Sequence, residues 1–417
     1  MSEAARPRRL CIINTHPIQY YAPLYRYLAE NDTEIELEVF YLSDLSLRGE
    51  YDSGFRRSVT WDIDLLSGYT SRFVGPNYKK ATPGAFSSLV VPELLPAIIK
   101  GRFDAVAIYG YSHAASIVAA VAARVSGADL FFRCDMNVLV AKRRRQDLAK
   151  RLFVRSVFAA CSKMLVIGSR NREYYRWMGV PDRKFVFAPF TVDNDRFFAA
   201  SRLTHEERST VRAGLGIVGS KTALLFISKF MPGKRPDLLI KAAAALAADG
   251  YPLHLVMAGS GEMEEELRAL AGCYPSLSVS FPGFVNQSEM PKVLGACDVM
   301  VFPSEIDQWG LIVNEAMAVG LPVIVGAESG CAPDLVENGV NGFLVPPGDL
   351  DALTAALEQI VADDALRARM GEASLKRMQT WSFRETHAGL RQALGLRSVS
   401  GDGTMRTPAS LAGVAST

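Results

Sequence analysis

The chain has 417 residues, a length that predicts two large domains or three small ones. Charged residues make up 22% and hydrophobic residues 49%, which allows a sizeable core and excludes wholesale disorder. The 46 lysines and arginines nearly balance the 44 aspartates and glutamates, so the formal charge of +2 argues against a protein that coats nucleic acid.

The six cysteines form no CxxC pair and have no histidine at ligand spacing. A disulfide framework or zinc site is therefore not expected, and a reducing, cytoplasmic compartment fits this pattern. The start of the chain, MSEAARPRRLCIINTH, lacks an apolar run long enough for a signal peptide. Residues 105–123 lack charge but are interrupted by Gly110, Ser112 and Ser116, so they predict a buried strand and helix instead of a membrane span.

In the first half of the chain, short apolar runs alternate with longer amphipathic segments. The runs are too short for helices and most are rich in β-branched or aromatic residues, so they predict strands. These predicted strands are residues 10–14, 35–42, 105–109, 130–132 and 164–167. The predicted helices between them are residues 22–30, 92–100, 114–125, 145–160 and 170–178. Such alternation is typical of a parallel sheet covered on both faces.

The pattern breaks over residues 188–221, a largely polar segment that predicts a linker with one short helix. The alternation of strands and helices then starts again. The predicted strands are residues 223–228, 253–258, 279–281, 299–302, 323–325 and 343–345. The predicted helices are residues 235–248, 262–271, 288–296, 311–319 and 350–361. The chain is therefore expected to hold two α/β domains in series with a ligand cleft between them.

The boundaries of the two predicted domains follow from this pattern. Residues 1–200 and 201–380 are expected to form two Rossmann-like domains that face each other. Residues 381–396 predict a C-terminal helix that packs back on the first domain. Residues 397–417 are rich in Ser, Gly, Thr and Ala, and predict a disordered tail.

The most informative motif covers residues 301–325 and reads VFPSEIDQWGLIVNEAMAVGLPVIV. A loop with Asp307 follows the predicted strand, and Gly310 opens a predicted helix that contains Glu315. The first N–H groups of a helix lack partners and its dipole is positive there, so this helix start predicts an anion site that Gly310 leaves open. Both acids are also compatible with ordinary solvated positions.

A second motif, KFMPGK, follows the predicted strand 223–228. Lys229 and Lys234 stand at the carboxyl end of this strand, where two cations can bracket a diphosphate. A solvated lysine pair is the alternative. The turn GSGE at residues 259–262 is a weaker signal, because it is also an ordinary strand-to-helix turn.

Together these motifs resemble the signature of retaining glycosyltransferases of family 4, which have the GT-B fold. That family carries two acids separated by seven residues, around a glycine-containing helix start, which correspond here to Asp307 and Glu315. Lys229 and Lys234 correspond to its basic pair. Further similar segments are FAPFTVDNDRF at residues 187–197 and CAPDLVENGVNGFLVPPGD at residues 331–349.

The resemblance implies a retaining transfer of a sugar from a nucleotide-diphosphate sugar to an acceptor hydroxyl in glycan or glycoconjugate biosynthesis, without metal or other cofactor. The first domain would bind the acceptor, a glycan, a lipid-linked glycan or a small metabolite, and the second domain the donor. The implied contacts are Glu315 with ribose, Asp307 with the donor sugar, Lys229, Lys234 and the N–H groups of Gly310 and Leu311 with the diphosphate, Phe284 and Val285 with the base, and Ser304 in the donor loop.

Two positions depart from the usual family pattern. Asp307 stands where Glu is usual, and Lys229 stands where Arg is more usual and gives no bidentate fork. Both residues keep the expected charge, so the prediction of a transferase stands.

The first domain contributes further candidates after its predicted strands. His113 follows the strand 105–109, where the family places a sugar-contacting histidine, and we expect it to be catalytic together with Lys229, Lys234 and Asp307. Weaker candidates for the acceptor or sugar side are His16, Arg133 and Asp135. Capping, packing or ion pairing is the alternative role for each of these three.

Three questions stay open at this point. The basic run KRRR at residues 142–145, followed by an amphipathic helix, is either the solvated face of a core helix or a peripheral contact with an anionic membrane at its inner face. A sugar-nucleotide epimerase on the same fold is an alternative function. A non-catalytic bilobal sugar-binding protein is another.

Overall fold

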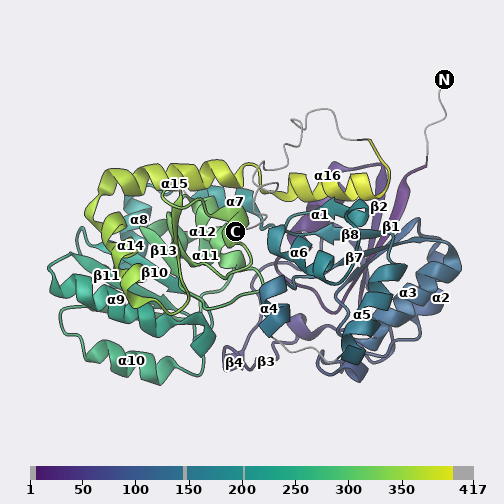
Figure 1. Ribbon diagram of the computed structural model, residues 1–417, viewed down its shortest axis with the longest axis horizontal. Coiled ribbons are helices and arrows are strands. Elements are labelled where there is room, and N and C mark those ends of the chain that lie inside the picture. Colours follow the sequence, from purple (N-terminus) through teal and green to yellow (C-terminus); the bar gives the residue numbers. More distant parts are fainter. Residues whose placement is uncertain (1–5, 144–147, 201, 398–417) are drawn as a thin grey trace.

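The computed structural model describes residues 6–143, 148–200 and 202–397, so the predicted tail from residue 398 onward lies outside the described residues. Figure 1 shows two lobes side by side, one from each half of the chain, and each contains a parallel sheet with helices on its faces. Among the described helices, none is long and apolar enough to span a bilayer.

The first lobe is a parallel sheet between helices. Its strands are β1 (Arg8–Asn14), β2 (Ile35–Tyr41), β5 (Thr70–Phe73), β6 (Ala105–Tyr109), β7 (Asp129–Arg133), β8 (Lys163–Val166) and β9 (Phe185–Phe187). Its helices are α1 (Ala22–Asn31), α2 (Leu94–Gly101), α3 (Ala114–Ser126), α4 (Val138–Arg143), α5 (Leu148–Ala160) and α6 (Ser169–Trp177). Over the described residues the strand order is β5-β2-β1-β6-β7-β8-β9. The order reverses between β1 and β6, so the loops that follow these two strands diverge and leave a crevice.

The second lobe repeats this plan. Its strands are β10 (Thr222–Ile227), β11 (Leu253–Ala258), β12 (Ser278–Gly283), β13 (Val299–Phe302), β14 (Val323–Gly326) and β15 (Gly342–Val345). Its helices are α7 (Asn194–Ala200), α8 (His205–Gly214), α9 (Pro236–Ala248), α10 (Glu264–Gly272), α11 (Met290–Ala296), α12 (Leu311–Val319), α13 (Ala332–Leu335), α14 (Leu350–Ala362) and α15 (Asp364–Met378). The strand order in the described part of the chain is β12-β11-β10-β13-β14-β15, with the reversal between β10 and β13.

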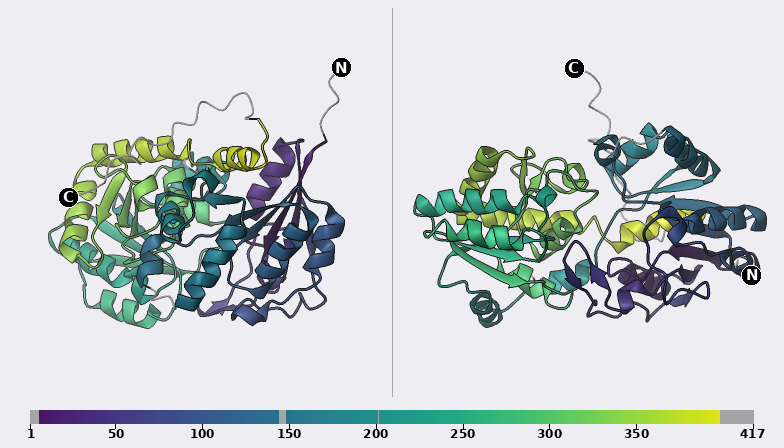
Figure 2. Two further views of the ribbon diagram at one scale, coloured as in Figure 1. Left: turned by 45° about the vertical axis from the view of Figure 1, so that its right-hand side comes forward. Right: turned by 90° about the horizontal axis from the view of Figure 1, so that it is seen from below.

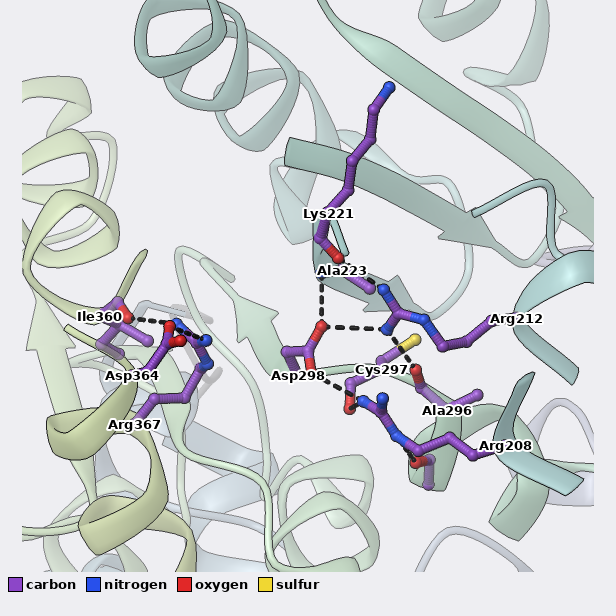
Figure 3. A network of polar contacts seen from close by, with 11 residues as sticks. Arg208, Arg212, Lys221, Ala223, Ala296, Cys297, Asp298, Ile360, Asp364 and Arg367 are labelled. Atoms are coloured by element: carbon purple, nitrogen blue, oxygen red, sulfur yellow. Dashed lines mark hydrogen bonds and ion pairs between the residues drawn. The ribbon is translucent and has the colours of Figure 1, made fainter. Parts of the chain in front are cut away.

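The predicted linker at residues 188–221 is wrong in one respect, because it contains two helices, α7 and α8, where one was expected. Two arginines of α8 are anchored instead of solvated. Arg208 and Arg212 bind the carboxylate of Asp298 at 2.7 and 3.1 Å, and Asp298 also accepts a hydrogen bond from the Ala223 N–H (Figure 3). This network joins α8 to the amino ends of β10 and β13. The cleft lies at the opposite, carboxyl ends of these strands.

The last described helix, α16 (Phe383–Ala393), returns to the first lobe. Both views in Figure 2 place it against this lobe, beyond the end of α15. Phe383 joins the apolar core under the first sheet, and His387 and Arg391 bind the buried carboxylate of Asp32 at 2.6 and 2.7 Å. The chain therefore crosses between the lobes twice, once before α7 and once after α15.

A small antiparallel hairpin stands apart from both sheets. It consists of β3 (Tyr51–Asp52) and β4 (Arg57–Ser58), in a stretch where the sequence predicted no regular element. Its position between the lobes in Figure 1 brings residues of the first lobe to the wall of the second.

Candidate active site

A cavity of about 490 Å³ lies between the lobes, and both lobes line it. The loop after β1 contributes Tyr20 and Tyr21, and the loops after β10 and β13 contribute Lys229, Lys234 and Asp307. Because β10 and β13 are hydrogen-bonded neighbours at the point where the strand order reverses, their loops meet although they lie far apart in sequence. The sheet topology thus assembles the residues that the two motifs of the second domain predicted.

Both predicted lysines reach the cavity, and both are ion-paired with a carboxylate. Lys229 Nζ donates hydrogen bonds to the two carboxylate oxygens of Asp52, at 2.9 and 3.0 Å. Lys234 binds Asp307, which also accepts a hydrogen bond from the Trp309 N–H at 3.1 Å. The cavity therefore holds two positive charges whose partners in this structure are side chains of the protein.

The N-terminal turn of α12 faces the same space. Gly310 caps this helix with φ of +97°, and a Cβ at this position would lie 3.0 Å from the ring of Phe302, so glycine is the residue that fits. Gly310, Leu311 and Ile312 line the cavity. Since the first N–H groups of a helix lack intrahelical partners, this turn adds hydrogen-bond donors and a positive dipole end beside the lysines.

Glu315, in the second turn of α12, is a buried acid. Its side chain lines the cavity, the residue is 1% exposed, and its Oε1 has no hydrogen-bond partner within the described part of the chain. Burial raises the pKa of Glu315 to about 8, although the charge of Arg196 opposes this shift. A buried acceptor that faces a cavity is suited to hydroxyl groups of a ligand, because an unmade hydrogen bond there is costly.

The residues predicted to edge the base, Phe284 and Val285, also line the cavity. The ring of Phe284 meets Phe55 at 5.0 Å and Trp61 at 6.1 Å, both from the segment around the small hairpin. None of Asp52, Phe55 and Trp61 was predicted from the sequence. They follow no motif and no periodic pattern, so their role in the cleft appears only in the fold.

Ser304 is buried in the loop after β13. Its hydroxyl donates to the carbonyl oxygens of Gly233 and Ile306, at 3.1 and 3.2 Å. These contacts join the loops that carry Lys234 and Asp307. Ser304 is thus placed to hold the loops, and its predicted contact with the donor stays a prediction.

The candidates of the first lobe do not all reach the cavity. Asp135 lines it, whereas His16, His113 and Arg133 are absent from its lining as far as the described residues show. His16 and His113 follow β1 and β6, where the strand order of the first sheet reverses. Burial and the nearby His113 lower the pKa of His16 to about 4, and burial lowers the pKa of His113 despite a 3.4 Å contact with the Ala85 carbonyl. Their predicted contacts with sugar or acceptor stay predictions.

Arg133 supports the crossing between the lobes. It is 1% exposed, and its guanidinium donates to the carbonyl oxygens of Ala188 and Pro189 at 2.6 and 3.1 Å. The same guanidinium packs on the rings of Tyr21 and Phe190. These contacts explain why a buried arginine ends β7, since it satisfies the carbonyl groups of the interdomain segment.

Known proteins resemble part of the chain in sequence. Residues 207–377 match the family model described as glycosyl transferases group 1. A GDP-mannose-dependent monoacylated alpha-(1-6)-phosphatidylinositol monomannoside mannosyltransferase of Corynebacterium glutamicum is 33% identical over 207 residues, which are 48% of this chain and 53% of that protein. The chain thus matches about half the length of this curated relative.

Solved structures resemble the whole chain in fold. The Anabaena protein Alr3699/HepE in complex with UDP has a TM-score of 0.70 at 18% identity, over 93% of this chain and 99% of that one. WaaG, a glycosyltransferase involved in lipopolysaccharide biosynthesis, has a TM-score of 0.63 at 14% identity, over 92% and 98%. The predicted fold class, two Rossmann-like domains in the GT-B arrangement, is confirmed. The match of residues 207–377 to group 1 supports the resemblance to glycosyltransferases, and family 4 stays a prediction.

Proposed function

We propose that this chain, whose residues 207–377 match the model of the group 1 glycosyl transferases, is a retaining glycosyltransferase that uses a nucleotide-diphosphate sugar. One observation carries the proposal: a single cavity joins two lysines, the open N-terminus of α12 and the unpartnered carboxyl of Glu315. The GDP-mannose-dependent relative and the UDP complex of the solved neighbour support a nucleotide-sugar donor. They leave the base open between guanine and uracil.

Each group of the cavity has a role in this proposal. Lys229, Lys234 and the N–H groups at Gly310 and Leu311 hold the diphosphate, whose negative charge grows as it leaves the sugar. Glu315 accepts hydrogen bonds from the ribose hydroxyls. Asp307 exchanges its contact with Lys234 for hydroxyls of the sugar, while Phe284 and Val285 edge the base.

The proposed chemistry retains the anomeric configuration. The bond between the anomeric carbon and the phosphate oxygen breaks, and the acceptor oxygen bonds to the same face of the sugar. The acceptor proton passes to the departing phosphate oxygen. Because fixed cations lower the barrier to this departure, the proposal needs no metal. His113 remains a proposed sugar contact, and Asp135 is the acceptor-side candidate that lines the cavity.

A screen for thermal stabilisation tests the proposal. A nucleoside diphosphate present at about 100 times its Kd should stabilise the protein by about 2.7 kcal/mol, which corresponds to a rise in melting temperature of about 5 to 10 °C. UDP, GDP and ADP should be compared with their monophosphates and with free sugars. If none of the diphosphates raises the melting temperature, the proposal is wrong. Stabilisation by free sugar alone would support a binding protein, and consumption of donor without acceptor would support an epimerase.

We also propose that the protein is cytoplasmic and that its first lobe, the one proposed to bind the acceptor, makes a peripheral contact with an anionic membrane. Leu148 and Leu152 on α5 are 68% and 57% exposed, next to Lys150, although their spacing would suit a core face. Beside them, a cavity of about 630 Å³ is lined by Phe86 and Phe153, among others. An exposed apolar face flanked by cations is typical of helices that rest on acidic lipid. Such a surface suits an acceptor that is itself linked to lipid.

Flotation with vesicles tests this contact. Vesicles that contain phosphatidylglycerol should retain most of the protein at low salt, and retention should fall several-fold in about 0.5 M NaCl because salt screens the cations. The variant L148E/L152E should lose retention while keeping its melting temperature, since both side chains are exposed. The matched control is Val218→Glu, an exposed apolar residue on the second lobe. No retention of the wild type at low salt would exclude the membrane contact.

A further inference from the structure

We propose that residues 51–62 of the first lobe, here named the strap, close the donor end of the cleft, and that Asp52 holds Lys229 in the place of the donor diphosphate until the donor displaces it. The inference rests on the proposed function, because it assigns Lys229 an internal competitor for the group it would bind. It concerns residues that no motif of the sequence identified.

The strap is attached to the second lobe along its whole length. At one end Asp52 binds Lys229, and further along the Ser260 hydroxyl donates to the Phe55 carbonyl at 2.8 Å. At the other end the Asn286 side chain donates to the Thr60 carbonyl at 2.8 Å. These partners follow β10, β11 and β12 in turn, so the strap crosses the carboxyl ends of three neighbouring strands, where an α/β sheet binds its ligands.

Aromatic contacts seal the strap over the predicted position of the base. Phe55 meets the edge of Phe284 with ring centroids 5.0 Å apart, and Arg57 lies 4.9 Å from the centroid of the same ring. Lys229 Nζ is 4.8 Å from the centroid of Phe55. The strap therefore touches both groups that the donor would need, the lysine at the diphosphate and the phenylalanine at the base.

Hydrogen bonds within the strap hold the carboxylate of Asp52 in place. Its Oδ1 accepts hydrogen bonds from the N–H groups of Gly54 and Phe55, at 2.8 and 3.0 Å, in addition to those from Lys229. Burial by itself would raise the pKa of Asp52, but these hydrogen bonds outweigh it and hold the pKa below its ordinary value. At Gly54 a Cβ would lie 2.6 Å from the Lys229 side chain, so the turn leaves room for the lysine.

A bound diphosphate and the Asp52 carboxylate would compete for Lys229. Two negative groups within about 4 Å of each other repel, and Lys229 would have to divide its hydrogen bonds between them. Donor binding and the Asp52–Lys229 pair therefore compete. Because the strap belongs to the lobe proposed to bind the acceptor, its displacement would also signal to that lobe that the donor has bound.

The variant Asp52→Asn tests the competition. It keeps the size of the side chain and removes the charge, so UDP or GDP, whichever the wild type binds, should bind about fivefold more tightly by calorimetric titration. In a protein that also carries Lys229→Gln, the change Asp52→Asn should not increase the nucleotide affinity, because the Asp52 carboxylate then has no lysine to bind. Unchanged or weaker nucleotide binding by Asp52→Asn in the Lys229 protein would overturn the inference.

A matched control separates this effect from a general change of charge. Glu50 lies next to the strap and pairs with Arg48 at 3.0 Å, so Glu50→Gln removes an equal charge nearby without freeing Lys229. Its nucleotide affinity should equal that of the wild type, and a gain as large as that of Asp52→Asn would overturn the inference. If the wild type binds neither nucleotide, the proposed function itself fails, and the two failures are thereby distinguished.

Discussion

Replacing Lys234 by alanine is expected to slow sugar transfer about 100- to 1,000-fold while the fold stays intact. The lysine lies at the wall of the cavity where the diphosphate would leave, and removal of one preorganised contact to a developing charge costs about 2.7 to 4 kcal/mol of barrier. Folding should suffer little, because Asp307 keeps its hydrogen bond from the Trp309 N–H. The rate is measured at saturating donor, and circular dichroism checks the fold.

A lysine outside the cavity provides the matched control. Lys241 on α9, the helix that follows the KFMPGK motif, pairs with Asp237 at 3.4 Å and is 39% exposed, so Lys241→Ala removes a lysine without touching the cleft. Its rate should stay within about twofold of the wild type, since exposed ion pairs contribute little. Full activity of Lys234→Ala would show that the diphosphate does not bind at this lysine, and the proposed role of the lysine pair would then be wrong.

The sequence predicted the interior of the fold better than its periphery. The central strands of each sheet are buried on both faces, so they appear as continuous apolar runs, and β11 was predicted with the bounds that the structure has. Helix α15 was not predicted, because only four of its 15 residues are buried and charged residues are scattered among the others. Residues 188–221 were expected to hold one helix and hold two, α7 and α8, because arginines of this polar stretch bind Asp298 instead of facing water.

The candidate site divides in the same way. Lys234 and Asp307 belong to two motifs, each of which lies within a single loop. The pairing of β10 with β13 then brings the two loops together. Asp52 had no such signal, because its partner Lys229 is 177 residues away and its own segment has no periodic pattern. Arg133 looked like a ligand because it ends a strand at the cleft, but contacts with the crossing segment occupy its guanidinium. Sequence spacing therefore predicts contacts within a loop, and contacts between lobes require the fold.

Replacing Glu315 by glutamine is expected to stabilise the empty protein increasingly as the pH rises. The native carboxyl, with its pKa raised to about 8 by burial, keeps its proton over a range in which the unfolded chain, with an ordinary value of 4.5, has lost it. The unfolded state thus binds fewer protons, so the stability of the wild type falls between about pH 4.5 and pH 8. Glutamine has no such loss. The melting temperatures of the two proteins should therefore diverge across this window, and the difference in their free energies of unfolding should reach up to about 5 kcal/mol.

The same substitution is expected to weaken binding of the nucleoside diphosphate about 10- to 100-fold, because hydroxyl groups that donate to a carboxylate gain more than those that donate to an amide. Titration at pH 8.5, where the carboxyl is ionised, measures the loss. Glu337→Gln changes an exposed carboxyl of the same lobe, and it should alter neither the pH profile nor the affinity. Divergent melting curves with unchanged affinity would leave Glu315 a buried acid without a ligand and would assign the ribose to another part of the cavity. Parallel melting curves would instead show that water or a counter-charge already satisfies the carboxylate, which removes the reason for placing hydroxyl groups there.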